Sequence, residues 1–458
     1  MLGLGLGQYL PYVIYGIFFL IALVALFYRN EIGILFIAFF LPIYALLNKT
    51  IKLELPLAKD IIDILIIAML VGWLLQRKKS EEQQLSHSPL LLPIFLFMAY
   101  SLFSFIQGTS TLGSDLFSEV SEQRLADWKN YMIMPLLYLI AYYNLRDRKW
   151  QYALFILLSI SFLVMDFKFR ETFRWFQQAH FTNDMRIPGT LGFLGPNEWG
   201  SFHTIYNLFL IGLFMIDKHV WRRIAYLILI AGGTYCLLYS YSRGAYVGFF
   251  VGLVFIGLVR SRKLLIPLVV FLLVWKLILP LSVVERIEGT IVDQSDLVQS
   301  ERADLMSVGG SELDTAKRAE IWTMALDYFS QNPIFGNGFR TFGILTGWDT
   351  HNVYLKHLAE QGLIGFILYL WLYVLALRSG WRLYRDGNEE LVKAFGFAFL
   401  CAVVGSMVVN FFGDRWTYLQ IGGLYWIFWA LADQEYSMLK AKEASAALEG
   451  TTTTTANA

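Results

Sequence analysis

The chain has 458 residues, of which 57% are hydrophobic and 17% aromatic. Apolar runs long enough to cross a hydrocarbon core of about 30 Å recur from end to end, which excludes a soluble globular domain and predicts an all-α, polytopic integral membrane protein. The formal net charge of +1 is uninformative in itself. The two cysteines, Cys236 and Cys401, lie inside apolar runs and offer neither a disulfide framework nor a zinc-binding spacing.

We expect about thirteen transmembrane helices, or twelve if one short early segment is re-entrant. Their centres fall near residues 18, 39, 68, 98, 138, 158, 208, 231, 252, 272, 370, 402 and 425. The chain then divides into a transmembrane scaffold (1–167), a transmembrane core with an external cavity-lining segment (168–281), a large helical external loop (282–362), C-terminal transmembrane helices (363–435) and a disordered cytoplasmic tail (436–458).

Short basic connectors occur at alternate turns of this count, and the positive-inside tendency assigns them to the cytoplasm. They are Arg77 to Lys79, Arg146 to Lys149, Arg222-Arg223, Arg260 to Lys263, and Arg378 to Arg385. The other connectors, including Gly413-Asp414-Arg415, are then external, and they also carry positive charge. Anion binding is one reason for external arginine, although for most of these residues pairing with nearby acids is the simpler explanation.

The external segment from Arg186 to Glu198 contains glycine and proline at short intervals, which predicts irregular backbone that enters the membrane at Trp199. Such backbone must be covered by protein or line a water-filled cavity. We therefore expect the segment to line a cavity, although its polar groups could equally serve only to satisfy its own backbone.

Arg243 lies in a very short connector between two apolar runs, in the sequence Ser242-Arg243-Gly244. This spacing predicts that Arg243 lies at the outer membrane boundary, at the depth of the lipid headgroups. A guanidinium group there suits capture of two phosphate oxygens, because it is planar and always charged. Snorkelling of a long side chain toward water is the alternative.

In the long loop, Asp314 or Thr315 can cap a helix that runs to about Gln331, with an apolar stripe that includes Ile321 and Ala325. Arg318 falls in its first turn, where positive charge is unfavourable against the helix dipole unless an anion or an acid compensates. A salt bridge to Asp314 or to the neighbours of Glu320 is the structural alternative.

Two later features of the loop predict local structure. The sequence Phe335-Gly336-Asn337-Gly338-Phe339 is a tight turn that lets backbone approach another surface closely. After it, Asp349 or Thr350 can cap a short helix that ends at Gly362.

His351 lies at the start of that short helix, where the dipole disfavours the protonated imidazole. This suits a general base that must be neutral near pH 7, although a loop histidine without any role is the common alternative. His357 has no metal-ligand spacing from His351. His203, near the start of a predicted span, is expected to be a hydrogen-bonded residue of the bundle.

These motifs, in this order, resemble the O-antigen ligase and polymerase superfamily of bacterial inner-membrane glycosyltransferases. The resemblance is carried by Ser242-Arg243-Gly244, Arg318-Ala319-Glu320-Ile321-Trp322, Pro333-Ile334-Phe335-Gly336-Asn337-Gly338, His351-Asn352-Val353-Tyr354-Leu355 and Glu360-Gln361-Gly362-Leu363-Ile364-Gly365. It extends from about Arg186 to Gly365, whereas the first six predicted spans match only in hydrophobic character.

The resemblance implies transfer of a glycan from an undecaprenyl-diphosphate carrier to an acceptor hydroxyl at the periplasmic face, with inversion and without a metal or cofactor. Arg243 and Arg318 would then bind the diphosphate, and His351 would remove the acceptor proton. Further candidates for contact with the diphosphate or acceptor are Arg186, Asn197, Asn352 and Trp348. Membrane lipids are expected partners, and nucleic acid is not.

The acceptor separates the enzymatic alternatives. A ligase uses lipid A-core or another terminal hydroxyl, a polymerase uses a second carrier-linked repeat, and a protein O-oligosaccharyltransferase uses a protein. A metal-dependent oligosaccharyltransferase is disfavoured, because the first external stretch offers only Glu54 and the nearby Asp60 as acidic ligands. A lipid-linked glycan transporter is the non-enzymatic alternative, but the middles of the predicted spans are nearly devoid of ionisable residues.

Two tryptophans of the long loop have faces that could bind a sugar ring, Trp322 and Trp348. For Trp322, we expect instead that the indole packs the loop helix onto the bundle.

Overall fold

The computed structural model describes residues 10–44, 61–77, 88–115, 118–173, 180–191, 194–289 and 315–456. Within these ranges, all regular secondary structure is helical. The helices are α1 (Leu10–Phe27), α2 (Asn30–Phe40), η1 (Leu41–Ile43), α4 (Ile61–Arg77), α5 (Leu91–Thr111), α6 (Glu119–Asn144), α7 (Arg148–Thr172), η3 (Asn183–Met185), α8 (Pro196–Ile216), α9 (Val220–Leu238), α10 (Arg243–Arg260), η4 (Arg262–Leu264), α11 (Leu265–Ile278), α12 (Leu281–Glu288), α13 (Thr315–Gln331), α14 (Thr341–Thr346), α15 (Val353–Asp386), α16 (Glu390–Phe411) and α17 (Leu419–Ala456).

The chain is an all-α, multi-pass membrane protein. Each predicted span centre falls within a helix. Six helices of the described chain, α5, α7, α8, α10, α15 and α16, are long and apolar enough to cross a membrane, and the bent pair α11–α12 would make a seventh. By length and composition, the described residues therefore support six or seven of the twelve or thirteen expected spans. The apolar parts of α1, α2 and α4 are too short, and α6 and α9 carry charged residues in their first turns.

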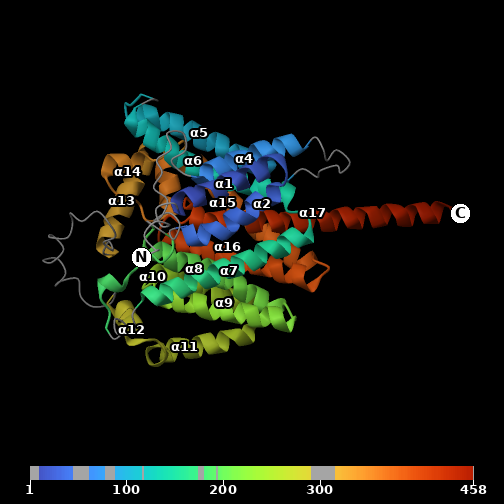
Figure 1. Ribbon diagram of the computed structural model, residues 1–458. Coiled ribbons are helices and arrows are strands. Elements are labelled where there is room, and N and C mark those ends of the chain that lie inside the picture. Colours follow the sequence, from blue (N-terminus) through green and yellow to red (C-terminus); the bar gives the residue numbers. More distant parts are fainter. Residues whose placement is uncertain are drawn as a thin grey trace, which may run out of the picture.

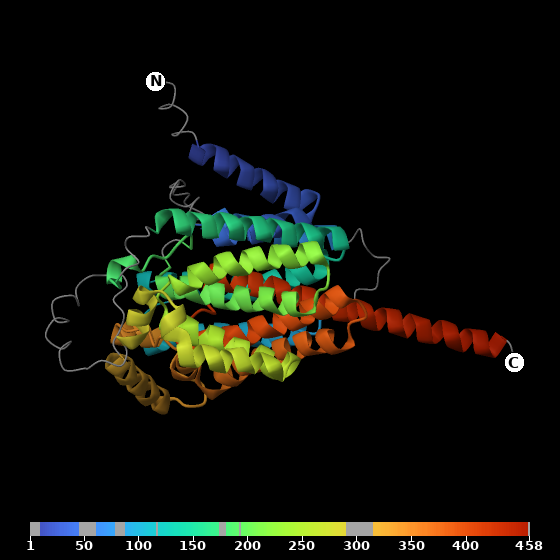
Figure 2. The ribbon, with the colours of Figure 1, turned by 90° about the horizontal axis from the view of Figure 1, so that it is seen from below.

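The long helices form one bundle in which most axes run roughly parallel (Figures 1 and 2). At one end, which we call the loop end, lie α12, α13 and α14. At the opposite end, the tail end, the last turns of α17 extend beyond the bundle. The axes of α11 and α12 differ by 109°, so α12 turns away from the direction of α11.

The predicted disorder after Tyr436 is wrong for the described residues, because α17 continues as a helix to Ala456. Much of this extension consists of Ala, Leu, Lys and Glu, which are strong helix formers and need little tertiary support. Lys440 and Glu443, which lie one turn apart, form an ion pair at 2.7 Å that further stabilises this helical extension.

Ion pairs join several of the basic connectors that are predicted to share one side of the membrane. Arg148, at the start of α7, lies 3.7 Å from Glu389 in the α15–α16 connector and 2.8 Å from Glu435 in α17. Lys218, in the α8–α9 connector, lies 2.9 Å from Glu390. The basic connectors of α6–α7, α8–α9 and α15–α16 therefore meet at the tail end, as the alternating topology predicts.

The centre of the bundle is built around α8 and α16, most of whose residues are buried. Small residues let these helices approach closely: a Cβ on Gly212 would lie 2.6 Å from the Cα of Ala398. Close contact between small residues is the usual basis of helix association in membranes, where the hydrophobic effect gives little drive. This contact fixes the C-terminal half of α8 against α16.

The glycine turn of the long loop packs directly on two helices, as its sequence predicts. Gly336 and Gly338 have φ values of 77° and 111°. The backbone N–H of Gly338 donates to the carbonyl of Glu360 at 2.7 Å, and that of Phe339 donates to the carbonyl of Ser104 at 2.9 Å. The turn thus joins α13 and α14 to α5 and to the start of α15.

Gly338→Ala is expected to destabilise the protein by about 2–4 kcal/mol, which combines overpacking with a left-handed backbone. A Cβ at this position would lie 2.1 Å from the Cα of Gly108. Gly347→Ala is the matched control, because Gly347 also has a positive φ of 75° but a Cβ there would have no atom within 4 Å. Thermal unfolding of the purified variants should therefore give a clearly lower Tm for Gly338→Ala. Equal shifts in the two variants would contradict this packing.

Candidate active site

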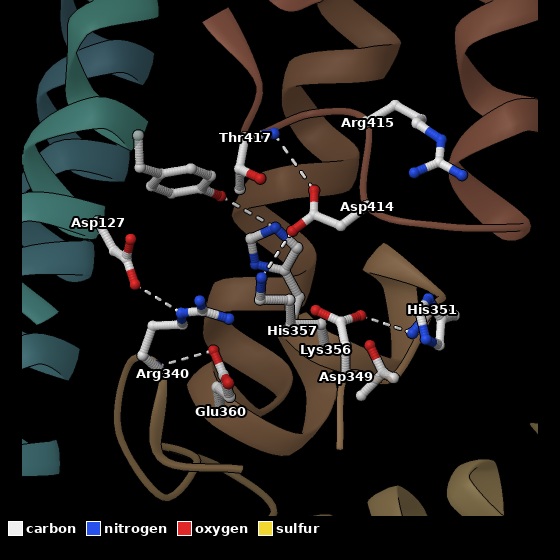
Figure 3. Close-up of polar contacts among 12 residues, drawn as sticks. Asp127, Arg340, Asp349, His351, Lys356, His357, Glu360, Asp414, Arg415 and Thr417 are labelled. Atoms are coloured by element: carbon white, nitrogen blue, oxygen red, sulfur yellow. Dashed lines mark hydrogen bonds and ion pairs between the residues drawn. The ribbon is translucent and has the colours of Figure 1, made fainter. Parts of the chain in front are cut away.

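His351 is positioned by a capped loop that precedes α15 (Figure 3). The N-cap of α15 is Asn352, whose Oδ1 accepts from the backbone N–H groups of Tyr354 at 3.0 Å and Leu355 at 3.2 Å. The predicted caps, Asp349 and Thr350, are therefore wrong by two or three residues. Asn352 takes the cap because it is the residue with extended backbone directly before the first helical turn. The predicted break at Gly362 is present as a non-helical residue inside α15, with φ 64°.

Asp349 instead fixes the backbone of His351. Its Oδ1 accepts from the N–H of His351 at 2.7 Å, which closes a tight turn. His351 has a φ of 47°, a left-handed conformation that few residues with a side chain adopt. Its imidazole is half-buried. Such backbone strain is common where a side chain must be held in one orientation for function.

The surroundings of His351 favour its neutral form. Burial lowers the pKa of His351 most, and the nearby carboxylate of Asp349 opposes this effect. The positive charges of Arg318 and Arg415 lower that pKa further. A neutral imidazole beside two guanidinium groups can accept a proton, as a general base requires.

Arg318 lies in the first turn of α13, which spans Thr315–Gln331 as predicted. The predicted stripe residues Ile321 and Ala325 are buried in a small apolar cluster with Phe342 of α14 and Ala359 of α15. One turn after Arg318, the indole N–H of Trp322 donates to the carbonyl of Thr350 at 3.0 Å. The same ring lies 5.5 Å from that of Phe411 in α16, so Trp322 packs the loop helix onto the bundle, as expected.

The charge of Arg318 is uncompensated within the described part of the chain. The ion pair of its helix turn joins Lys317 to Glu320 at 2.9 Å and does not include Arg318. The alternative partner considered from the sequence, Asp314, lies outside the described residues. Burial lowers the pKa of Arg318 most, and the like charges of Arg243 and Arg415 lower it further.

Arg243 and Arg186 lie in the same electrostatic cluster. Arg243 is the first residue of α10, directly after the short connector from α9, and is half-exposed. Arg186 lies in the irregular segment before α8, where its Nη2 donates to Oδ1 of Asn197 at 3.0 Å. Burial, followed by the positive charge of Arg243, lowers the pKa of Arg186 to about 10.

Two further arginines, Arg286 and Arg415, join the cluster, and neither is among the residues that the sequence motifs predict for the site. Arg286 lies on α12, where its Nε donates to the carbonyl of Tyr241 at 3.2 Å. Burial, then the charges of Arg186 and Arg243, lower the pKa of Arg286 to about 9. A signal was available, because α12 is strongly amphipathic and Arg286 lies one turn after the buried Val283, on the same side of the helix.

Arg415 is the second, from the connector between α16 and α17. It is buried, forms an ion pair with Glu198 of α8, and its Nε donates to Oγ of Ser201 at 3.1 Å. The sequence placed Arg415 in an external connector but gave no indication that its partner lies more than 200 positions earlier. Glu198 is thus the acid that offsets part of the positive charge of the cluster.

A buried polar network beside His351 supports the site (Figure 3). Nζ of Lys356 lies 2.6 Å from Oδ2 of Asp414, the residue before Arg415. The His357 ring contacts the Tyr131 hydroxyl at 3.0 Å, so it serves the core. Glu360 accepts from the backbone N–H of Arg340 at 2.9 Å. These contacts fix the α16–α17 connector and the long loop to the first turns of α15.

Trp348 lies at the edge of the site. Its ring is half-buried, and Nζ of Lys317 lies 4.8 Å from the ring centre. Asn352 is buried, and its carbonyl oxygen Oδ1 is already used for the cap of α15. Asn352 therefore contributes by holding His351, the residue before it, in position at the start of α15.

The fold and the site together define a class of protein. It is a multi-pass helical membrane protein with a cationic site around a neutral histidine at one end of the bundle. Residues 224–370 match the family model described as O-antigen ligase. This match to part of the chain supports the O-antigen ligase and polymerase superfamily and a membrane enzyme of that type. The match includes Arg243, Arg286, Arg318 and His351. No curated protein matches the chain.

Proposed function

We propose that the protein is an O-antigen ligase that transfers a glycan from undecaprenyl diphosphate to a hydroxyl of lipid A-core, at the periplasmic face of the bacterial inner membrane. The observation that carries the proposal is the group of arginines around His351. Burial lowers the pKa of Arg186, Arg286 and Arg318 most, and the like charge of neighbouring arginines lowers each further, so the site gathers positive charges that repel. An anion with more than one charge would relieve that repulsion, and a diphosphate is such an anion.

In the proposed reaction, the acceptor oxygen attacks the anomeric carbon of the glycan as the bond from that carbon to the phosphate oxygen breaks. The bonding electrons leave with the diphosphate, where Arg318 and Arg243 stabilise the developing negative charge. His351 accepts the proton of the acceptor hydroxyl. Attack opposite to the leaving group inverts the anomeric carbon.

The remaining candidates have supporting roles in this proposal. Arg186, oriented by Asn197, provides another contact for the diphosphate or the acceptor. Asn352 positions His351 through the cap of α15. Trp348 offers an aromatic face for a sugar ring at the edge of the site. Fixed guanidinium groups can supply the electrostatic stabilisation that a metal ion gives in other transferases, so no catalytic metal is required.

The periplasmic orientation rests on the charge of the connectors. Basic connectors meet at the tail end, which the positive-inside tendency assigns to the cytoplasm. The loop end, with His351, then faces the periplasm. A polymerase or a protein O-oligosaccharyltransferase would use the same groups with a different acceptor, and a lipid-linked glycan transporter would bind the donor without transferring it.

The pH dependence of transfer should report the pKa of His351. A general base works in its neutral form, so kcat/KM falls as the pH drops through that pKa, and a lowered pKa moves this acid limb below about 6.5. Asp349 raises the pKa of His351, so Asp349→Asn should shift the limb to lower pH while keeping the oxygen that accepts from the His351 backbone. Arg318→Gln should shift it upward. Limbs that stay unchanged in both variants would argue against His351 as the titrating base.

The direct test is a transfer assay with purified protein, an undecaprenyl-diphosphate glycan as donor and three acceptors: lipid A-core, a second carrier-linked glycan, and a protein. Transfer to lipid A-core in the presence of EDTA supports the ligase. Elongation of the carrier-linked glycan would assign a polymerase instead, and glycosylation of the protein would assign an oligosaccharyltransferase. Donor binding without transfer to any acceptor would favour the transporter.

A further inference from the structure

Three potential metal ligands meet inside the bundle, apart from the arginine cluster. They are Asp166 of α7, His203 of α8 and Cys236 of α9, and all three are buried. Their ligand atoms lie within 4.8 Å of one another. Each residue comes from a different helix, so the group is formed by tertiary packing and leaves no spacing motif in the sequence.

The contacts within this group leave one polar atom unsatisfied. Sγ of Cys236 lies 3.5 Å from Oδ1 of Asp166. Nε2 of His203 lies 3.8 Å from the same oxygen, which is too far for a hydrogen bond, and it has no other partner among the described residues. The expectation that His203 is a hydrogen-bonded bundle residue is therefore wrong for this nitrogen. His203 is 3% exposed, and the surrounding helices place its unpaired Nε2 beside the carboxylate of Asp166 and the thiol of Cys236.

The surrounding helices also provide room for the polar groups. A Cβ on Gly232 would lie 2.6 Å from Oδ2 of Asp166, so this carboxylate fits only because α9 has a glycine there. One turn along α8 from His203, Asn207 occupies the space that a Cβ on Gly233 would fill. Its Nδ2 is a second buried polar atom without a partner in the described chain. The interface of α8 with α9 is therefore adapted to polar groups rather than to apolar packing.

We propose that Asp166, His203 and Cys236 bind a structural zinc ion. Nitrogen, sulfur and carboxylate oxygen are the ligands that zinc takes in proteins, and its tetrahedral bonds separate neighbouring ligand atoms by about 3.5 Å. The two separations of 3.5 Å and 3.8 Å come close to that value. A water would fill the fourth position.

Charge balance favours a divalent ion at this position. A thiolate, a carboxylate and a neutral imidazole carry two negative charges, which one Zn²⁺ neutralises. A neutral complex is the form in which ionisable groups are best tolerated inside a membrane bundle. The ion would also use Nε2 of His203, which otherwise has no partner in the described chain.

The ion would connect α7, α8 and α9 to one another. His203 lies one turn from Trp199, and their ring centres are 4.5 Å apart. A Cβ on Gly189 would lie 2.6 Å from the Trp199 ring, so the irregular segment that carries Arg186 packs on the same tryptophan. The zinc site is thus a positioning device for the first turn of α8 and takes no part in the transfer reaction.

Metal analysis of the purified protein tests the proposal independently of activity. We expect about one zinc per chain in the wild type, measured by inductively coupled plasma mass spectrometry, and only a small fraction of that in His203→Ala and in Cys236→Ser. Cys401→Ser is the matched control, because Cys401 is equally buried but lies outside the group. It should keep its zinc. Retention of zinc by Cys236→Ser would overturn the proposal.

A second measurement avoids variants that fail to fold. Wild-type protein produced in medium with Co²⁺ in place of Zn²⁺ should show thiolate-to-cobalt charge-transfer absorption in the near ultraviolet, together with the visible bands of tetrahedral cobalt. The same preparation of Cys401→Ser should show both. Folded wild-type protein that takes up neither zinc nor cobalt would contradict the site. Because neither readout depends on glycan transfer, failure of the proposed ligase activity would leave this test unaffected.

Discussion

His351→Ala is expected to lower kcat for glycan transfer by about 10²–10⁴-fold, the usual contribution of a general base. The variant should still bind the lipid-linked donor, because the arginines that contact the diphosphate in our proposal remain in place. The loss of kcat is expected because the variant lacks the imidazole whose lowered pKa keeps it neutral and able to accept the proton of the acceptor hydroxyl. Single-turnover transfer and donor binding, measured on the same preparation, separate the two effects.

His219→Ala is the matched control for that experiment. His219 is exposed in the α8–α9 connector at the tail end, where its backbone N–H donates to Asp217 and its backbone carbonyl accepts from Arg223. Its removal should leave kcat unchanged. Wild-type transfer by a folded His351→Ala protein would remove His351 from the mechanism.

Arg318→Ala is expected to reduce kcat/KM by about 10²–10³-fold, as is typical when a preorganised donor to a developing negative charge is removed. Arg318→Lys should restore only part of the activity, because an ammonium group cannot contact two phosphate oxygens in one plane. The loss should be in catalysis and donor affinity rather than in folding, since Arg318 has no ion-pair partner in the described chain whose loss would destabilise it.

Arg262→Ala provides the control for a generic effect of removing positive charge. Arg262 is exposed at the α10–α11 connector and belongs to a basic connector rather than to the cluster. Its replacement should leave kcat/KM near the wild-type value. If Arg262→Ala and Arg318→Ala lost activity equally, the effect would come from the overall charge of the protein and not from the site.

Local features of the loop were predictable from sequence because short-range rules determine them. The helix that carries Arg318 follows from its apolar periodicity, and the close contact of Gly338 follows from residues that tolerate left-handed backbone. The break at Gly362 is likewise a local signal. Together these features define the neighbourhood of His351 without any knowledge of tertiary contacts.

The remaining parts of the site depend on contacts between distant segments. The partnership of Arg415 with Glu198 joins two connectors that are far apart in the chain, and no local pattern specifies it. Arg286 was passed over because a charged residue in a short amphipathic helix is normally solvated. The cap at Asn352 was misassigned because Asp349, Thr350 and Asn352 are all good capping residues, and only the backbone geometry selects one of them.

The pairing of Asp414 with Lys356 and of Arg415 with Glu198 has a consequence for the biogenesis of the protein. Two adjacent residues in the α16–α17 connector link this connector to α15 and to α8, respectively. Because the ribosome makes that connector after every other part of the site, Lys356 and Glu198 stay without these partners until α16 has been synthesised. The catalytic end of the bundle is therefore completed last, and a nascent chain that stops before Asp414 has His351 and the other arginines but lacks Arg415 and the two links that this connector makes to α15 and α8.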